Sequence, residues 1–266
     1  MKLPPRPLPR TLLPLFVFVL AGLALSCSAE QARPTDASAE REKLSELIAQ
    51  ADQLYAQRES VERAREAVAV IRRARFADTG NYESAWKLAK FNYYLGEHEK
   101  DEKLRAEAFR EGIAAGEAAV RVGPNKPEGH FWLGANLGGR ARLQGPLYAL
   151  ASVPDIRKEM EAVIKIDESF QAGSAYLALG QIDLELPEIM GGNRERAVEN
   201  LEKGLRFGEQ NAMLRLRLAE AYLDVKRPVD ARRQLDAIFK LKPSPDYLPE
   251  YKQTEAAARA LLEKRF

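Results

Sequence analysis

From residue 42 to the C-terminus, apolar residues recur at intervals of three and four, and Gly and Pro fall between the segments that carry this pattern. No stretch alternates apolar and polar residues with a period of two. The first pattern is typical of amphipathic helices and the second of half-buried strands, so the sequence predicts an all-α chain.

The pattern also repeats as a unit, most clearly over residues 212–245, whose packing positions are Leu218, Ala219, Tyr222, Ala231, Leu235, Ile238 and Pro243. Similar units run from Tyr176 to Gly204, from Leu133 to Val163 and from Trp86 to Pro124, and a degenerate pair of helices is expected at about 42–57 and 60–76. Small residues let antiparallel helices cross closely, and large ones fill the space between neighbouring pairs. Because no pair buries its apolar face alone, such units stack.

The spacing within these units resembles that of tetratricopeptide repeats. We therefore predict a tetratricopeptide-like helical-hairpin solenoid of about four to five repeats over residues 41–266. The proline-rich stretch 243–249 interrupts the chain, and residues 250–264 are expected to form a helix that caps the last repeat.

Three of the units are longer than the last one at the same turn, through extra segments at 95–105, 138–154 and 186–193. In a solenoid this turn lies on the same edge of every repeat, so the extra segments should gather on one rim. Insertions collected on one side often mark the binding side.

The N-terminus has the layout of an export signal. Residues 1–11 carry three basic side chains and four prolines, and residues 12–25 are almost wholly apolar but short for a membrane span. Ala24-Leu25-Ser26-Cys27 resembles the lipobox of bacterial lipoproteins, although Ala24 stands where that family usually has Leu. A plain signal peptide with a chance cysteine is the alternative.

The lipobox resemblance predicts a signal peptide at 1–26 and a lipid on Cys27, with acyl chains such as palmitate that hold the protein on a membrane. Residues 27–40 are polar and are expected to form a flexible tether. The expected location is the bacterial cell envelope, facing the periplasm, and Ser28 after the cysteine favours the outer over the inner membrane.

Composition narrows the possible partners. The 41 basic and 39 acidic side chains are interspersed along the chain, which argues against a nucleic-acid partner. A single cysteine rules out a disulfide within the chain, and with only two histidines no Cys/His zinc cluster can form.

No motif in the sequence indicates an enzyme. The HExxH, Gly-x-Ser-x-Gly and phosphate-loop motifs are absent, which leaves an enzymatic function unsupported, and no cofactor is expected.

Residues 124–262 resemble the T-component proteins of tripartite ATP-independent periplasmic (TRAP) transporters. The resemblance lies in Gly129-His130-Phe131-Trp132-Leu133-Gly134, in the Gly-rich insertion that begins Gly138-Gly139-Arg140, and in Leu186-Pro187-Glu188-Ile189-Met190-Gly191-Gly192. It implies an exported lipoprotein whose repeats surround a pore or groove, and which associates with a periplasmic solute-binding protein and conveys an apolar ligand. The sequence contains no transporter membrane domain, so that role requires other proteins.

Six residues are candidates for ligand or partner binding, each with a structural alternative. His130 could hydrogen-bond a ligand carboxylate, or it could cap a helix or pack in place, and Trp132 could line a groove or pack in the core. Arg140 and Arg142 could clamp an anion or form a solvated pair. Gly191 and Gly192 could form a backbone anion site, or serve only as a loop before a helix capped by Asn193.

We therefore expect a membrane-anchored, non-catalytic scaffold that binds an exported protein. A T-component of a TRAP-type uptake system is the first alternative, and an envelope assembly lipoprotein is the second.

Overall fold

The computed structural model describes residues 34–266. The predicted signal peptide, Cys27 and the first part of the predicted tether lie outside the described residues. Within 34–266 the chain forms eleven α-helices and two 3-10 helices, with no strand. The helices are α1 (Pro34–Tyr55), α2 (Val61–Ala77), α3 (Tyr82–His98), α4 (Glu102–Val122), α5 (Pro127–Gln144), α6 (Pro146–Ile166), α7 (Phe170–Glu185), η1 (Glu188–Met190), α8 (Arg194–Phe207), α9 (Ala212–Asp224), α10 (Pro228–Ile238), η2 (Pro245–Tyr247) and α11 (Leu248–Arg265).

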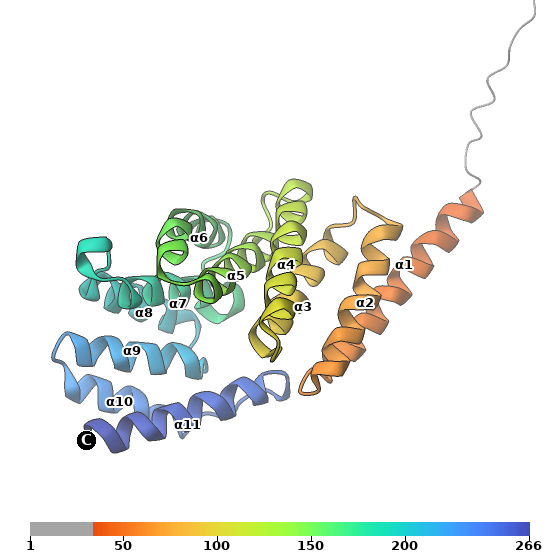
Figure 1. Ribbon diagram of the computed structural model, residues 1–266. Helices are drawn as coiled ribbons and strands as arrows, with labels where there is room; N and C mark the ends of the chain where they lie inside the picture. Colours follow the sequence, from red (N-terminus) through yellow and green to blue (C-terminus); the bar gives the residue numbers. More distant parts are fainter. Residues whose placement is uncertain (1–33) are drawn as a thin grey trace, which may run out of the picture.

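Successive helices pair into antiparallel hairpins, and the hairpins stack along a curved array (Figure 1). Each helix from α1 to α10 packs on its neighbours in the sequence, and alternate helices also touch, as α3 does with α5 and α7 with α9. The all-α helical-hairpin solenoid predicted from the repeat pattern is confirmed.

Glycines in the repeat grid lie where helices cross. A Cβ atom at Gly116 in α4 would come within 2.8 Å of the Cα atom of Leu133 in α5. Gly180 in α7 leaves a similar space for the side chain of Leu201 in α8. The Gly138-Gly139 pair lies within helix α5 and not in a loop, which corrects the sequence interpretation of a Gly-rich insertion. The ring of Phe109 occupies the space beside Gly139, where a larger residue would not fit.

Helix α1 starts earlier than expected, since it begins at Pro34. Residues 34–40 are therefore helical and not part of a flexible tether. Proline is well suited to the first turn of a helix, and no further Pro or Gly follows before Tyr55 to interrupt it. Residues 38–40 are exposed, so local helix propensity, with no help from packing, accounts for this extension.

Two of the three lengthened turns are longer helices. The segment 95–105 forms the end of α3 and the start of α4, and 138–154 is helical on both sides of Gly145, whose φ of 93° only glycine adopts readily. The segment 186–193 is different, because it is a true loop that contains only the short helix η1.

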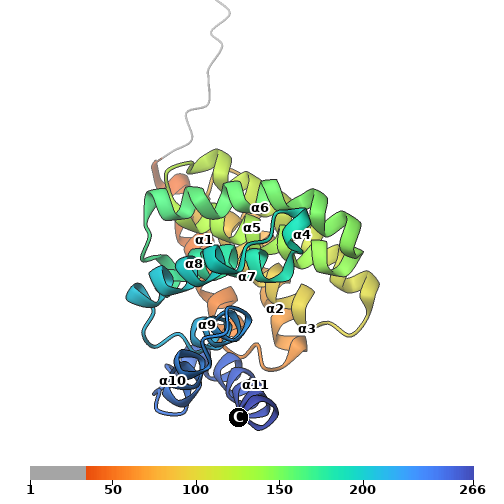
Figure 2. The same cartoon turned by 90° about the vertical axis from the view of Figure 1, so that its left-hand side faces the viewer.

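Helix α11 packs on α9 and α10, which confirms the predicted terminal helix. Its first turn also reaches the other end of the array. Arg58, in the turn between α1 and α2, has its Nη2 atom 3.2 Å from Oε1 of Glu250. Figure 1 shows the start of α11 beside that turn, and Figure 2 shows α9, α10 and α11 together below α5 to α8. The curvature of the array thus brings its first and last elements into contact.

Candidate functional site

An apolar cleft of about 610 Å³ lies between the α5–α6 hairpin, helix α7 and the loop that follows α7. Its floor includes Phe131, Ile156 and Met160, and its only charged lining residues among those described are Arg142 and Glu185. Pockets of this volume are typical of small-molecule ligand sites.

The lengthened segments form the two lips of this cleft. Residues at the end of α5 and the start of α6, including Pro146 and Leu150, form the first lip, and Leu186, Pro187 and Met190 form the second. The third segment joins the first lip through an ion pair between Arg142 and Glu97, with Nη2 2.6 Å from Oε1. The segments 138–154 and 186–193 thus meet at the cleft, and 95–105 is linked to them by this one ion pair.

Large apolar side chains are exposed next to these lips. Leu147 is 86% exposed at the start of α6, and Ile189 is 93% exposed in η1. Met190 lines the cleft and is half exposed. Single exposed apolar residues are common on protein surfaces, but a group that borders an apolar cleft indicates an interaction site.

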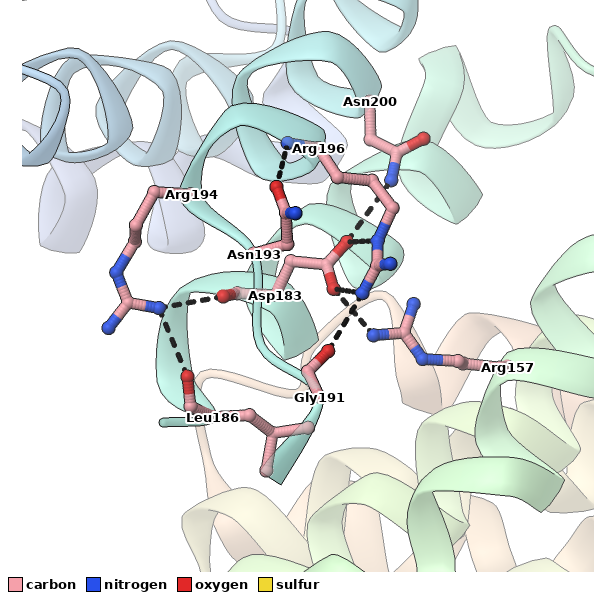
Figure 3. Close-up of polar contacts among 8 residues, drawn as sticks. All are labelled: Arg157, Asp183, Leu186, Gly191, Asn193, Arg194, Arg196 and Asn200. Carbon is pink, nitrogen blue, oxygen red and sulfur yellow. Dashed lines mark hydrogen bonds and ion pairs between the residues drawn. The ribbon is translucent and has the colours of Figure 1, made fainter. Parts of the chain in front are cut away.

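The second lip is held by the carboxylate of Asp183, which is fully buried in α7 (Figure 3). Arg157 from α6 donates to its Oδ1 atom at 2.5 Å, and Arg196 from α8 donates to Oδ2 at 2.8 Å. Burial raises the pKa of Asp183, but the hydrogen bonds from Arg196 and Arg157 outweigh that effect and hold the pKa below its ordinary value. Asp183 therefore ties three helices together at the base of the loop.

The loop itself is braced by side chains from α8 (Figure 3). Nη1 of Arg194 donates to the carbonyl oxygens of Asp183 and Leu186, and Nη2 of Arg196 donates to that of Gly191. Asn193 accepts the backbone N–H of Arg196 and so caps α8, as the sequence predicted. The loop that presents Ile189 thus has a fixed conformation, although most of it is not helical.

The predicted ligand residues do not gather at the cleft. Of the six, only Arg142 lines it. Arg140 stacks on Tyr148, with its guanidinium carbon 5.2 Å from the ring centroid. Trp132 is buried in the core and packs against Tyr93 and Phe131.

His130 and the two glycines have partners within the protein. The His130 ring places Nδ1 2.6 Å from Oε2 of Glu159 and Nε2 3.0 Å from the carbonyl oxygen of Pro124, so it links α5 to α6 and to the preceding turn. The backbone N–H groups of Gly191 and Gly192 donate to the carbonyl oxygens of Glu188 and Pro187. The three residues thus contact other parts of the protein, and none of them lines the cleft.

The residues that sequence reasoning missed are Asp183, Leu147 and Ile189. Ile189 belongs to the motif on which the TRAP T-component resemblance rests. Ile189 and Met190, two adjacent apolar residues beside Gly191 that do not fit a helical pattern, indicated an exposed apolar loop. Asp183 gave no such signal, because an acid inside an amphipathic helix is ordinarily a surface residue.

A second hollow, of about 830 Å³, lies where the start of α7 and the α8–α9 turn face the C-terminal segment. Gln171, Ala172 and Gly173 adopt three consecutive positive φ angles at its edge. Its lining includes Arg206, Glu209, Lys242 and Glu250, so it is more mixed in charge than the cleft. The cleft is the better candidate for recognition of an apolar partner.

Residues 34–266 contain neither a membrane span nor a metal cluster. None of the described helices is both long and apolar enough to span a bilayer. The same residues contain no group of three or more His, Cys, Asp or Glu side chains placed to hold a metal ion.

Comparison with solved structures shows the fold class. The chain is similar to TTC0263, a TPR protein of Thermus thermophilus, with a TM-score of 0.60 at 18% identity over 80% of this chain and 99% of that one. It is also similar to PilF of Pseudomonas aeruginosa, with a TM-score of 0.53 at 17% identity over 86% of this chain and 94% of that one. At these identities the likeness shows a tetratricopeptide-like fold and no more.

Comparison with sequences identifies the family. No curated protein matches the chain. The family model described as regulator of microtubule dynamics protein 1-3 matches residues 47–181, which is half of the chain and includes α2 to α6 and most of α7. The chain therefore belongs to the regulator of microtubule dynamics protein 1-3 family.

Proposed function

We propose that this protein is a non-catalytic scaffold for protein–protein interaction and that it binds its partner at the cleft between the α5–α6 hairpin and the 186–193 loop. The observation that carries the proposal is the pair of exposed side chains, Leu147 and Ile189, whose sequence neighbours Pro146 and Met190 line an apolar cleft from two sides. The buried Asp183 brace supports it, because a lip of fixed shape loses little conformational entropy on binding. Stacked helical repeats commonly present such extended binding surfaces.

The proposal includes the anchor inferred from the sequence. A lipid on Cys27 would hold the scaffold at the bacterial envelope, and the partner would then be another exported protein. The family description names the regulation of microtubule dynamics, but an exported bacterial lipoprotein would meet other partners, and for this reason we propose a partner from the envelope.

Photo-crosslinking in cells tests the binding surface. With p-benzoylphenylalanine in place of Leu147, irradiation of native membranes should yield one dominant adduct with an exported protein. The same group in place of Phe76, which is 77% exposed on α2 away from the cleft, is the control and should give no such adduct. Equal adducts from both positions, or none from Leu147, would reject the cleft as the partner site.

The anchor has its own test. Once its signal peptide is removed, the Cys27→Ser variant should move almost completely from the membrane fraction to the soluble fraction, because it lacks the acyl chains that supply stable attachment. Fractionation followed by immunoblotting measures this, and Ser28→Ala is the neighbouring control that should stay in the membrane fraction. A Cys27→Ser protein that sediments with membranes would contradict the lipid anchor.

The second candidate is the T-component role in TRAP-type uptake. The apolar lining of the cleft favours it, since the resemblance implies that such a protein conveys an apolar ligand. A Leu147 adduct with a periplasmic solute-binding protein would support this role, and an adduct with an outer-membrane biogenesis protein would favour the third candidate, an envelope assembly lipoprotein.

A further inference from the structure

The charges at the cleft are unevenly distributed between its two lips. On the lip formed by α5 and α6, the guanidinium of Arg142 is already paired with Glu97. On the other lip, Glu185 and Glu188 are exposed, and neither forms an ion pair with any residue in 34–266. The second lip therefore presents two exposed carboxylates without a direct ion pair, although the charge of Glu185 acts on Arg142 across the cleft.

These two carboxylates lie beside the most exposed apolar side chain of the described chain. Ile189 directly follows Glu188, and Glu185 is the last residue of α7. The lip is thus an apolar tip with an acidic border, next to a cleft whose floor is apolar. A complementary surface has an apolar stripe with basic residues along one side.

The absence of a strand edge and the aliphatic lining of the cleft indicate the secondary structure of the partner. Residues 34–266 offer no strand whose edge could accept another strand. The walls are helices, and most of the lining is aliphatic, with aromatic rings only at Tyr93 and Phe131. Polyproline segments bind grooves lined by aromatic rings, whereas an amphipathic helix lays an apolar face into a hydrophobic groove.

We propose that the cleft binds an amphipathic helix of the partner protein, with its apolar face between Leu147 and Ile189 and a basic flank against Glu185 and Glu188. This inference rests on the proposed scaffold function and adds the chemistry of the partner. A helix of three to four turns, roughly 11–14 residues, has enough apolar positions on one face for this contact.

Two model peptides test the proposal. Both are helical and carry Leu at positions i, i+3, i+4, i+7 and i+8; one carries Lys at the flanking positions and the other carries Glu. Fluorescence anisotropy is measured on the full-length chain with Cys27→Ser, so that no lipid is attached. The Lys peptide should bind about 10-fold more tightly than the Glu peptide at low salt, and this preference should shrink as salt screens the charges.

Variants assign the two parts of the interaction. The double variant Leu147→Ser, Ile189→Ser should weaken the binding of both peptides by at least about 10-fold, because side chains at the centre of an interface carry most of the affinity. Glu185→Gln with Glu188→Gln should abolish the preference for Lys, because binding of the Lys peptide weakens and the repulsion of the Glu peptide is relieved. Phe76→Ser removes an exposed apolar residue away from the cleft, so it should change the affinity for neither the Lys peptide nor the Glu peptide.

Three outcomes would overturn the proposal. These are equal binding of the two peptides, insensitivity to the cleft variants, and binding of a fluorescent fatty acid in the cleft with no binding of either peptide. The last outcome would assign the cleft to a lipid. If the Leu147 crosslink to an exported protein persists while both peptides fail, the scaffold function stands and only the helical, basic partner is rejected.

Discussion

The Asp183→Asn variant should lose about 3 kcal/mol of stability, the low end of the range for breaking a buried ion pair. The side chain of Asp183 is fully buried, and its carboxylate is the shared acceptor of Arg157 and Arg196. An amide of the same shape removes the negative charge and directs N–H donors at two cations. The low end applies because the Arg196 side chain is 45% exposed and can be hydrated again. Urea unfolding should show a lower midpoint with an unchanged slope.

The matched control is Glu199→Gln, which breaks an exposed pair with Lys203 one helical turn away and should cost less than about 1 kcal/mol.

The dependence of stability on pH provides a second check. The pKa of folded Asp183 lies below its ordinary value, so its stabilisation is complete above about pH 4 and is lost as pH falls through the folded pKa. The stability difference between wild type and Asp183→Asn should therefore be constant near neutral pH and shrink in acid. A difference of less than about 1 kcal/mol at neutral pH would mean that Asp183 does not hold the loop.

The Gly116→Val variant should lose about 2–3 kcal/mol. Its added Cβ atom would lie 2.8 Å from the Cα atom of Leu133, and a backbone atom in the middle of a helix cannot move aside cheaply. A β-branched side chain adds two further methyl groups to the same contact. The two helices would have to separate, and thermal unfolding monitored by circular dichroism should show a lower midpoint.

Gly138→Ala is the control for that substitution. Gly138 also lies in a helix, but a Cβ atom there would meet only Arg142 at 3.6 Å and Ile156 at 4.0 Å, which are ordinary contacts. The change should stabilise the protein by about 0.5–1 kcal/mol, because alanine loses less backbone entropy than glycine. If both variants behaved alike, helix propensity and not close approach would explain the glycines.

The repeat pattern predicted the helices well. The helix expected at 60–76 is α2 at Val61–Ala77, and the terminal helix expected at 250–264 is α11 at Leu248–Arg265. This success has a physical cause, since helical periodicity, caps such as Asn193 and small residues at crossings are all local in sequence. The glycine pair at 138–139 was misinterpreted because glycine serves both in turns and at close helix contacts, and the two uses look the same in sequence.

The candidate site was predicted only in outline. The lengthened turns located the rim, but they could not show that Arg142 alone, among the six candidate residues, faces the cleft. Asp183 is buried because arginines from two other helices surround it, and its sequence neighbours do not indicate that. The exposure of Leu147 and Ile189 depends in the same way on how hairpins distant in sequence pack together.

The contact between Arg58 and Glu250 has a consequence for how the fold opens. In a linear array of repeats each unit is stabilised only by its neighbours, so unfolding can begin as fraying at either end. Here Arg58, near the start of the array, pairs with Glu250 in its last helix, so opening either end of the array between them also breaks this ion pair. Removing it with Glu250→Gln should therefore speed amide exchange in both α2 and α11, although the two helices lie far apart in the sequence.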